Sequence, residues 1–209
     1  MWHSFFDRIF VITLDHYKSE PLRLRSNLAK QELGNHGIPF DWWQATYNDN
    51  GAYGCFLSYQ KLFNYCLEMG YRNILVFEDD LKIIHPSPNS VLAVALDQLP
   101  EDYHTIHLGP NTHVPLQYAN RHLLLTMNQC RSTHAQGYSQ EAMKQIISYE
   151  WTGTPIDQMI EEKLQPLGKC FCTYPLLVTQ RNGFSDIDKR EVNMYYIQER
   201  FENNTKHLR

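Results

Sequence analysis

Short apolar runs alternate along this chain with segments in which apolar residues recur at helical spacing. Residues 9–14 and 73–77 are largely apolar throughout, which is the pattern of strands buried on both faces. In residues 54–68 the apolar side chains fall on one face of a helix, and Gly70 follows as a stop signal. By the same criteria we expect further strands at residues 40–45, 105–108, 123–127 and 171–178, and helices at residues 19–34, 87–99, 139–149, 155–167 and 191–201.

The order of these elements predicts the fold class. Strands and helices alternate in the first half, so we expect an α/β fold with a mainly parallel central sheet flanked by helices. The chain shows no internal repeat and no low-complexity linker, which predicts one domain over residues 1–188, followed by a C-terminal helix and tail over residues 189–209. Sheets of this kind bind ligands at the carboxyl ends of their strands.

Three consecutive carboxylates, Glu78, Asp79 and Asp80, follow directly on the strand predicted at residues 73–77. If the strand continues, its side chains alternate, which places Glu78 and Asp80 on one side and Asp79 on the other. A pair of hard oxygen ligands suits Mn²⁺ or Mg²⁺, with substrate phosphates completing the shell. The alternative is an acidic turn that contacts only water. We favour metal or nucleotide binding because the motif lies where such sheets bind ligands.

Composition narrows the range of partners. The 209-residue chain carries a net charge of -4 and no basic stripe, which disfavours nucleic acid because phosphate binding needs clustered Lys and Arg. Five scattered cysteines, an odd number, do not suggest a disulfide framework and favour free thiols in a reducing compartment. The sequence contains neither a signal-peptide pattern nor an apolar stretch long enough for a membrane span, so we expect a cytoplasmic protein.

Six segments between residues 9 and 187 match a known set of motifs in order. An apolar strand at 9–14 comes first, then Gly-Cys-Phe-Leu-Ser at 54–58 and Leu-Val-Phe-Glu-Asp-Asp at 75–80. These are similar to the INL, GCxLSH and LEDD motifs of glycosyltransferase family 25, which includes lipooligosaccharide and collagen hydroxylysine galactosyltransferases. Tyr59 departs from the pattern, which has a histidine there. The family's later AYxIS, xPxD and P-hydrophobic-Q…SDI motifs resemble residues 134–139, 154–157 and 174–187.

The resemblance implies a GT-A fold, a nucleotide-sugar donor, a divalent cation and inversion at the anomeric carbon. The expected enzyme moves a hexose, galactose, from a UDP-sugar to a glycan or a glycosylated protein or lipid, as in lipopolysaccharide biosynthesis. Glu78 and Asp80 would hold Mn²⁺ or Mg²⁺, and Asp79 would bond the ribose or sugar of the donor. Thr13 and Leu14 end the first strand, where the family places the nucleotide base; the alternative is an ordinary buried strand end.

Further donor-binding candidates lie on the predicted helices. Arg23 and Arg25 are two residues apart and do not share a helix face, so at most one is expected to reach the donor. Cys55 and Ser58 open a helix whose N-terminus would attract phosphate, although Cys55 is equally a small core residue. One of the tryptophans at 42–43 would stack on a sugar face, although packing is the commoner role.

Asp157 is the candidate general base. Inverting transfer needs a carboxylate near the acceptor hydroxyl, opposite the leaving nucleotide. The alternative is a capping role, because Thr154 and Asp157, with Pro155 between them, resemble a capping box in which Asp157 bonds the Thr154 backbone. We favour the base because of the family resemblance, with Glu161 and Asp186 as the next candidates.

Two other functions stay open at this point. A metal-dependent nucleotide-sugar hydrolase would use the same acids to activate water, and it would release free sugar without any acceptor. A catalytically silent nucleotide-sugar-binding module would bind the donor without turnover, and the departure at Tyr59 is its best support. The leading hypothesis is a metal-dependent glycosyltransferase.

Overall fold

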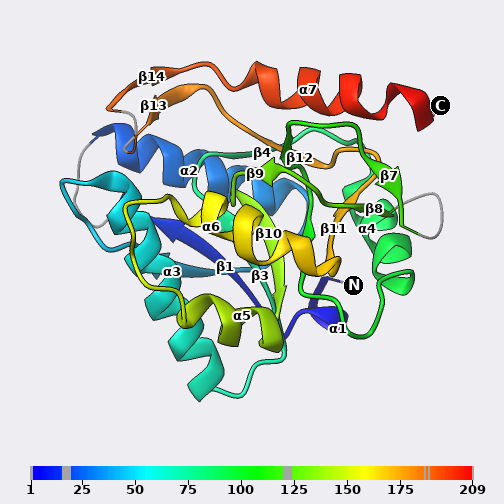
Figure 1. The fold of residues 1–209 in the computed structure, drawn as a ribbon. Coiled ribbons are helices and arrows are strands. Elements are labelled where there is room, and N and C mark those ends of the chain that lie inside the picture. The colour runs from blue at the N-terminus through cyan, green and yellow to red at the C-terminus, as the bar shows by residue number, and fades with distance from the viewer. Residues whose placement is uncertain (1, 16–19, 120–123, 186, 188, 209) are drawn as a thin grey trace.

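The computed structural model describes residues 2–15, 20–119, 124–185, 187 and 189–208. Its ribbon shows a central sheet with helices packed against it (Figure 1). The sheet contains eight strands in the order β2-β1-β3-β10-β5-β11-β8-β7. Their bounds are β1 (Arg8–Thr13), β2 (Asp41–Gln44), β3 (Asn73–Glu78), β5 (Thr105–His107), β7 (Gln117–Tyr118), β8 (Leu124–Thr126), β10 (Ala135–Ser139) and β11 (Cys170–Thr173).

Six strands of this sheet point the same way. β1 pairs in parallel with both β2 and β3, and β5 pairs in parallel with β11. β10 runs antiparallel between β3 and β5, and β8 runs antiparallel between β11 and β7. The expected α/β fold with a mainly parallel sheet is therefore confirmed. The carboxyl ends of β1, β2 and β3 consequently meet at one edge, which is where ligands bind in such sheets.

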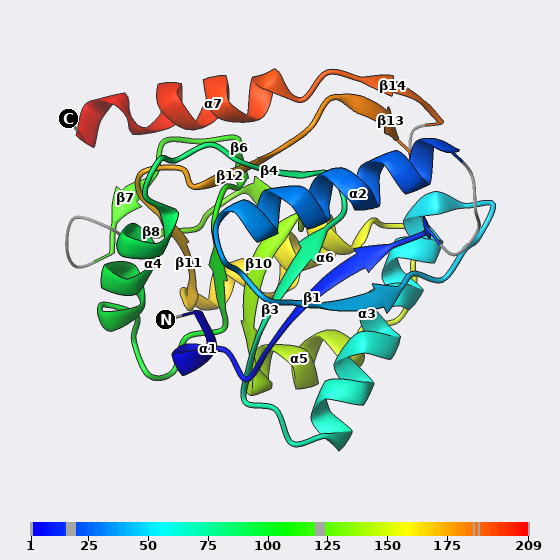
Figure 2. The same cartoon turned by 180° about the vertical axis from the view of Figure 1, so that it is seen from behind.

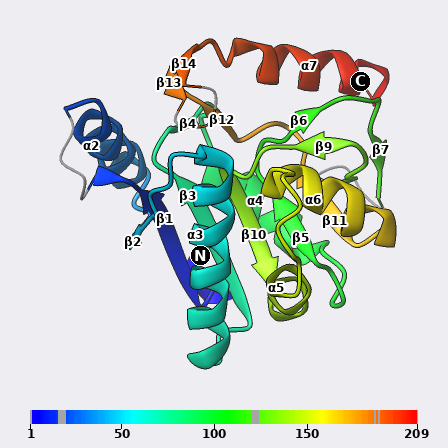
Figure 3. The same ribbon diagram turned by 60° about the vertical axis from the view of Figure 1, so that its left-hand side comes forward.

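Alternation along the buried strands gives the sheet two apolar faces. On β1, Ile9 and Val11 pack with α2 (Glu20–Asn35) and α4 (Pro88–Asp97). Phe10 and Ile12 pack on the other face, which is covered by α3 (Gly51–Glu68), α5 (Gln140–Ile147) and α6 (Ile156–Lys163). Figures 2 and 3 show α2 and α3 on opposite sides of the sheet. Both faces of the central strands are therefore buried beneath helices, which explains their continuous apolar sequence.

The sequence analysis did not predict β10. This strand reads Ala-Gln-Gly-Tyr-Ser, and all five residues are buried. A side chain at Gly137 would meet Phe6 at 2.8 Å and Ile106 at 2.9 Å, so the close packing there requires glycine. The polar Gln136 and the glycine break the apolar pattern that marks buried strands elsewhere in the chain, which is why the pattern failed here.

The two final predicted elements differ from the structure in their bounds. The strand expected at 171–178 is two strands, β11 and β12 (Val178–Gln180), with Pro175 between them. The helix expected at 191–201 is α7 (Tyr195–Thr205), because residues 190–192 form β14 (Arg190–Val192), which pairs with β13 (Gly183–Ser185). The other elements are α1 (Trp2–Phe5), β4 (Leu81–Ile83), β6 (Asn111–Thr112), β9 (Cys130–Arg131) and the short 3₁₀ turns Gln165–Leu167 and Lys206–Leu208.

The C-terminal helix α7 packs against the rest of the molecule. Ile197 and Phe201 are buried, and the Phe201 ring stacks on Tyr174 at a centroid distance of 6.3 Å. Asn204 on this helix donates to the Thr112 carbonyl at 3.1 Å. None of the helices in the described part of the chain is long and apolar enough to cross a membrane.

All five cysteines are free thiols, and four of them are buried. Burial raises the pKa of the Cys66, Cys130 and Cys170 thiols to about 12. These three side chains are therefore neutral and act as small apolar groups in the core.

Candidate functional site

A cavity of about 750 Å³ opens at the carboxyl ends of β1, β2 and β3. Its size is within the range of pockets that bind small molecules and cofactors. Of the site residues predicted from the sequence, Arg23 is exposed on α2 and does not line the cavity. The sequence-predicted residues that do line the cavity are Thr13, Leu14, Arg25, Cys55, Ser58, Glu78, Asp79, Asp80 and Asp157.

Glu78 is the last residue of β3, and one of its carboxylate oxygens binds two hydroxyl donors. Thr133 Oγ1 donates to Glu78 Oε1 at 2.7 Å, and Tyr59 OH lies 3.1 Å from the same oxygen. Burial, together with the negative charge of Asp80, raises the pKa of Glu78 to about 7. The two hydroxyls and the charge of Arg25 lower the pKa, but they do not offset burial and the charge of Asp80.

Asp79 accepts hydrogen bonds from a different set of residues. Thr13 Oγ1 donates to Asp79 Oδ2 at 2.7 Å, and the Arg25 guanidinium donates from Nε to Oδ1 at 2.9 Å. Only 1% of Asp79 is exposed, and this burial raises its pKa to about 6 although Arg25 lowers it. Both carboxylate oxygens are thus engaged within the protein, and the direct contact with the donor expected of Asp79 stays a prediction.

Asp80 lies in the turn after β3 and is held by the end of β12. Gln180 Nε2 donates to Asp80 Oδ2 at 3.1 Å, and the Arg181 backbone amide donates to the Asp80 carbonyl at 2.7 Å. The Arg181 guanidinium forms an ion pair with Glu32 of α2. Asp80 Oδ1 is buried and has no hydrogen-bond partner among the described residues. An oxygen in this state is costly unless a ligand binds it.

The sequence analysis assigned no role to Gln180 or Arg181. Gln180 was noticed only as part of a motif, because it lies 100 residues from Asp80 and no local pattern connects the two. The sequence analysis also did not predict the contact of Tyr59 with the acidic motif. Tyr59, which replaces the family's histidine, is fully buried and hydrogen-bonds to Glu78.

The start of α3 forms another part of the cavity wall. The helix begins at Gly51 rather than Gly54, and Asn50 caps it by accepting from the Tyr53 amide at 3.2 Å. Ser58 Oγ accepts from the Thr46 amide at 2.8 Å and donates to the Gly54 carbonyl at 2.7 Å. The Ser58 hydroxyl therefore fastens the loop after β2 to the helix, and its expected role in donor binding stays a prediction.

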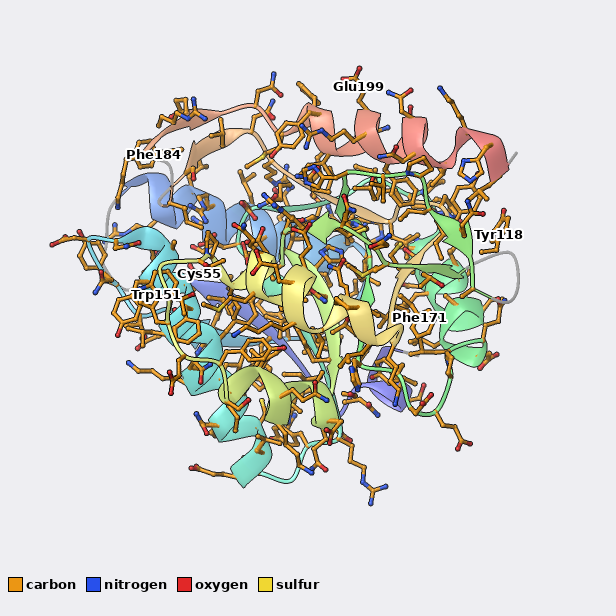
Figure 4. The ribbon with its side chains drawn as sticks, viewed as in Figure 1. Cys55, Tyr118, Trp151, Phe171, Phe184 and Glu199 are labelled. Carbon is orange, nitrogen blue, oxygen red and sulfur yellow. The ribbon has the colours of Figure 1, made fainter. Side chains whose placement is uncertain are left out.

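The loop after β2 passes close to α3 at Gly54, which precedes Cys55 on that helix. A side chain at Gly54 would lie 2.7 Å from the Thr46 carbonyl oxygen, so only glycine fits. Burial and the nearby charge of Glu78 raise the pKa of the Cys55 thiol well above its ordinary value, so the thiol is neutral. Figure 4 shows Cys55 on α3 and Phe184 on the β13–β14 hairpin, and both residues line the cavity.

Asp157 lies in the first turn of α6, where its carboxylate makes a tertiary contact. Oδ2 accepts from the Ser132 amide at 3.0 Å, and Oδ1 accepts from the Gln158 amide at 2.9 Å. These bonds differ from the one to the Thr154 backbone that a capping box would form. Ser132 has a φ of 69°, a conformation that costs energy for a non-glycine residue and is common at functional sites.

The segment 130–134 connects α6 to the acidic motif. Cys130 exchanges two hydrogen bonds with the Gln165 side chain, and Arg131 forms an ion pair with Glu161. Ser132 and Thr133 then contact Asp157 and Glu78, respectively. The segment therefore fixes the separation between Asp157 and Glu78. Glu161 is engaged by Arg131, and Asp186, the other alternative base, lies outside the described residues.

A metal site is only partly formed by protein groups. Within the described part of the chain, no group of three or more His, Cys, Asp or Glu side chains is arranged to hold a metal ion. Glu78 and Asp80 nevertheless offer hard carboxylate oxygens, and Asp80 Oδ1 has no partner in the described part of the chain. Such a pair suits a cation that takes its remaining ligands from water and substrate phosphate.

The family model for glycosyltransferase family 25, described as an LPS biosynthesis protein, matches residues 49–160, which is more than half of the chain. The chain belongs to glycosyltransferase family 25. No curated protein matches it. Its membership confirms the resemblance seen in the sequence and makes the chain a nucleotide-sugar glycosyltransferase.

Two solved structures show that this family 25 chain has a GT-A-like fold. One is a glycosyltransferase involved in the glycosylation of the major capsid of PBCV-1, with a TM-score of 0.53 and 12% sequence identity. The match covers 94% of this chain and 99% of that chain. The other is A197 from STIV, with a TM-score of 0.51 and 12% identity, over 89% of this chain and 92% of that chain.

Proposed function

We propose that this family 25 glycosyltransferase moves a hexose, galactose, from a UDP-sugar to a hydroxyl of a glycan or a glycosylated protein or lipid, with a divalent cation and with inversion. The observation that carries the proposal is the acidic motif at the base of the cavity. Glu78 and Asp80 are poorly neutralised there, and Asp80 Oδ1 has no partner among the described residues. A place in lipopolysaccharide biosynthesis belongs to the same proposal and is supported by the family's description. A cytoplasmic location is also part of it and rests on the sequence pattern alone.

The cation would be held by Glu78 and Asp80. Mn²⁺ or Mg²⁺ prefers carboxylate oxygens, and both of these carboxylates line the cavity. Burial raises the pKa of Glu78, and a bound cation would favour its ionised form instead. The chemistry that the metal supplies is neutralisation of the negative charge that builds up on the diphosphate as the sugar leaves.

The nucleotide would lie along the ends of β1 and β2. Thr13 and Leu14 line the cavity there, as does Arg25 from α2. Asp79 holds the Arg25 guanidinium in place, so Arg25 is oriented before the donor arrives. An arginine fixed in this way binds an anion without first losing side-chain freedom.

Asp157 would act as the general base. The Ser132 and Gln158 amides donate to its two oxygens, which fixes the orientation of the carboxylate. The carboxylate would take the proton from the acceptor hydroxyl as that oxygen attacks the sugar carbon opposite the nucleotide. Asp157 and Glu78 both line the cavity in which the reacting groups would meet.

A donor screen tests the proposal. UDP release is measured with several UDP-sugars, with Mn²⁺ and with EDTA, in the presence and absence of sugar acceptors, while calorimetry records donor affinity. We expect UDP-galactose to bind with Mn²⁺ and to lose most of its affinity in EDTA. Equal affinity in both conditions would exclude the metal role, and UDP release that ignores acceptors would identify a hydrolase.

Neighbouring variants separate cation binding from structure. Asp80→Asn should weaken donor binding in Mn²⁺ and leave the melting temperature in EDTA unchanged or higher, because it removes a repelling charge. Asp79→Asn should instead weaken donor binding in Mn²⁺ and in EDTA alike, because it releases the Arg25 guanidinium that Asp79 orients. The same loss of cation dependence in both variants would contradict this division.

A further inference from the structure

One wall of the cavity lies away from the strand ends and has no role in the proposed donor site. It is formed by β6, β9 and the start of α7, and Figure 3 shows β6 and β9 toward β5 and β11, on the opposite side of the view from α2 and β1. β6 pairs with β9, which brings Asn111 opposite Arg131. Both residues line the cavity, together with His113 and Tyr196.

Helix α7 is fastened to this wall. Arg200 Nη1 donates to Asn111 Oδ1 at 3.1 Å, and the Leu116 amide donates to the Asn204 carbonyl at 3.1 Å. The Arg200 guanidinium also lies over the Tyr196 ring, 4.9 Å from its centroid. Arg200 therefore orients Tyr196 and Asn111 together, which makes the wall a preorganised surface.

The wall adjoins the candidate base. Arg131 precedes Ser132, whose amide binds Asp157. The pKa of His113 is lowered by burial and by the charges of Arg200 and Arg131, while Asp157 and Glu161 act in the opposite direction. His113 and Asp157 line the same cavity, so a molecule bound against this wall shares that space with the carboxylate.

The chemistry of the wall matches a sugar ring. Sugars present hydroxyls around their edge and a patch of C–H groups on one face, so they need amide, imidazole and guanidinium partners beside an exposed aromatic ring. Tyr196 supplies such a ring at the cavity mouth, with 38% of the residue exposed. Trp42 and Trp43, the two stacking candidates from the sequence, do not line the cavity; they pack edge-on against Phe40 and Phe10, respectively.

We propose that Tyr196, together with Asn111, His113 and Arg131, forms the subsite that binds a sugar unit of the glycan acceptor. The proposal rests on the proposed function and adds the place where the acceptor binds. Tyr196 stacks on the sugar face, the polar side chains bond the sugar hydroxyls, and the acceptor hydroxyl then lies beside Asp157. The helix α7 is thus part of the active site rather than an appendage.

The test uses methyl glycosides of galactose, glucose, mannose and N-acetylglucosamine as probes. Saturation-transfer NMR reports which glycoside binds, and calorimetry with UDP-galactose and Mn²⁺ reports donor affinity. Tyr196→Ala should weaken glycoside binding roughly tenfold, the loss of one aromatic contact, and leave donor affinity unchanged. Tyr196→Phe keeps the ring and should bind the glycoside almost as well as the native protein.

Tyr195→Ala is the matched control. Tyr195 is the neighbouring residue, is 69% exposed and lines a separate hollow of about 290 Å³ rather than the large cavity. Its replacement should change neither affinity. The proposal is overturned if Tyr196→Ala weakens donor binding instead, if Tyr195→Ala has the same effect as Tyr196→Ala, or if no glycoside binds to the native protein. Failure of the proposed function looks different, because UDP-galactose would then not bind while the glycoside still would.

Discussion

At the scale of single residues, three adjacent acids have three different surroundings. Glu78 accepts from two neutral hydroxyls, Asp79 binds an arginine, and Asp80 keeps one buried oxygen without a partner among the described residues. The sequence motif alone does not separate them, because all three are carboxylates in a row. The partners decide which of them remain available to a cation.

Glu78 provides a pH-dependent test of this difference. Its pKa is raised from 4.5 to about 7 in the folded protein, so the folded state favours the protonated form. The group therefore costs stability as pH rises above 4.5, and the full cost is reached above about 7. In EDTA, Glu78→Gln should melt close to the native protein near pH 5 and several degrees above it near pH 8.

The measurement is a series of melting curves across this pH range for both proteins. Mn²⁺ should reduce the advantage of Glu78→Gln at high pH, because a cation offsets the native charge. Melting temperatures that change with pH in parallel for the two proteins would show that Glu78 is not the titrating group.

Asp157 is the residue for which catalytic and structural roles give different results. As a base, it acts only in the transition state, so Asp157→Asn should lower turnover roughly 10²–10⁴-fold with donor affinity nearly unchanged. As a purely structural contact to Ser132, it would lower the melting temperature and leave turnover largely intact. Glu162→Gln, on the exposed side of the same helix and outside the cavity lining, is the control. Near-normal turnover of Asp157→Asn would dismiss it as the base.

At the scale of elements, segment 130–134 connects a helix and a strand that the sequence places far apart. α6 contacts this segment through Asp157 and Glu161, which are four residues apart on one helix face, and Gln165 in the 3₁₀ turn that follows bonds Cys130. Thr133 then carries the connection to Glu78 at the end of β3. The segment therefore connects α6 to the acidic motif through direct contacts.

Removing the hydroxyls that hold Glu78 should reveal this connection. Tyr59→Phe and Thr133→Val each delete one donor to Oε1 with little change in shape. Each should weaken Mn²⁺-dependent donor binding several-fold. The effects of the two substitutions on donor affinity should not be additive in the double variant, because both bonds share one oxygen. Ser148→Ala, which deletes an exposed hydroxyl at the end of α5, is the control. Unchanged cation dependence in both single variants would contradict a positioning role.

At the scale of the whole molecule, α7 completes the core. Phe201 is 2% exposed and belongs to the same apolar cluster as β1 and α3. The division of the chain at residue 188 stays a prediction, but the burial of Phe201 and Ile197 gives a direct way to examine it.

Phe201→Ala should lower the free energy of unfolding by about 3–5 kcal/mol, the usual cost of emptying a buried phenylalanine site. Urea denaturation followed by circular dichroism measures this change, and Glu199→Ala, on the exposed side of the same helix, is the control. A single transition shifted to lower urea would show that α7 unfolds with the domain. Two separate transitions, or no shift, would show that the helix is an independent tail.

The sequence alone determined the parts of this protein that depend on local pattern. Apolar runs identified β1 and β3, helical periodicity identified α3, and six motifs in order identified the family. The acidic motif was predicted to lie at a ligand-binding edge because it follows a buried strand, and the cavity is there. These features depend on neighbours along the chain, which the sequence displays directly.

Only the tertiary structure decided which residues meet. The hydrogen bond between Gln180 and Asp80 spans 100 residues, that between Tyr59 and Glu78 connects a helix to a strand, and Ser132 contacts Asp157 through a backbone amide that carries no side-chain signal. The strand β10 escaped detection because its burial comes from strands on both sides rather than from its own composition. Such contacts arise from packing between distant segments, and a pattern read along one chain contains no record of them.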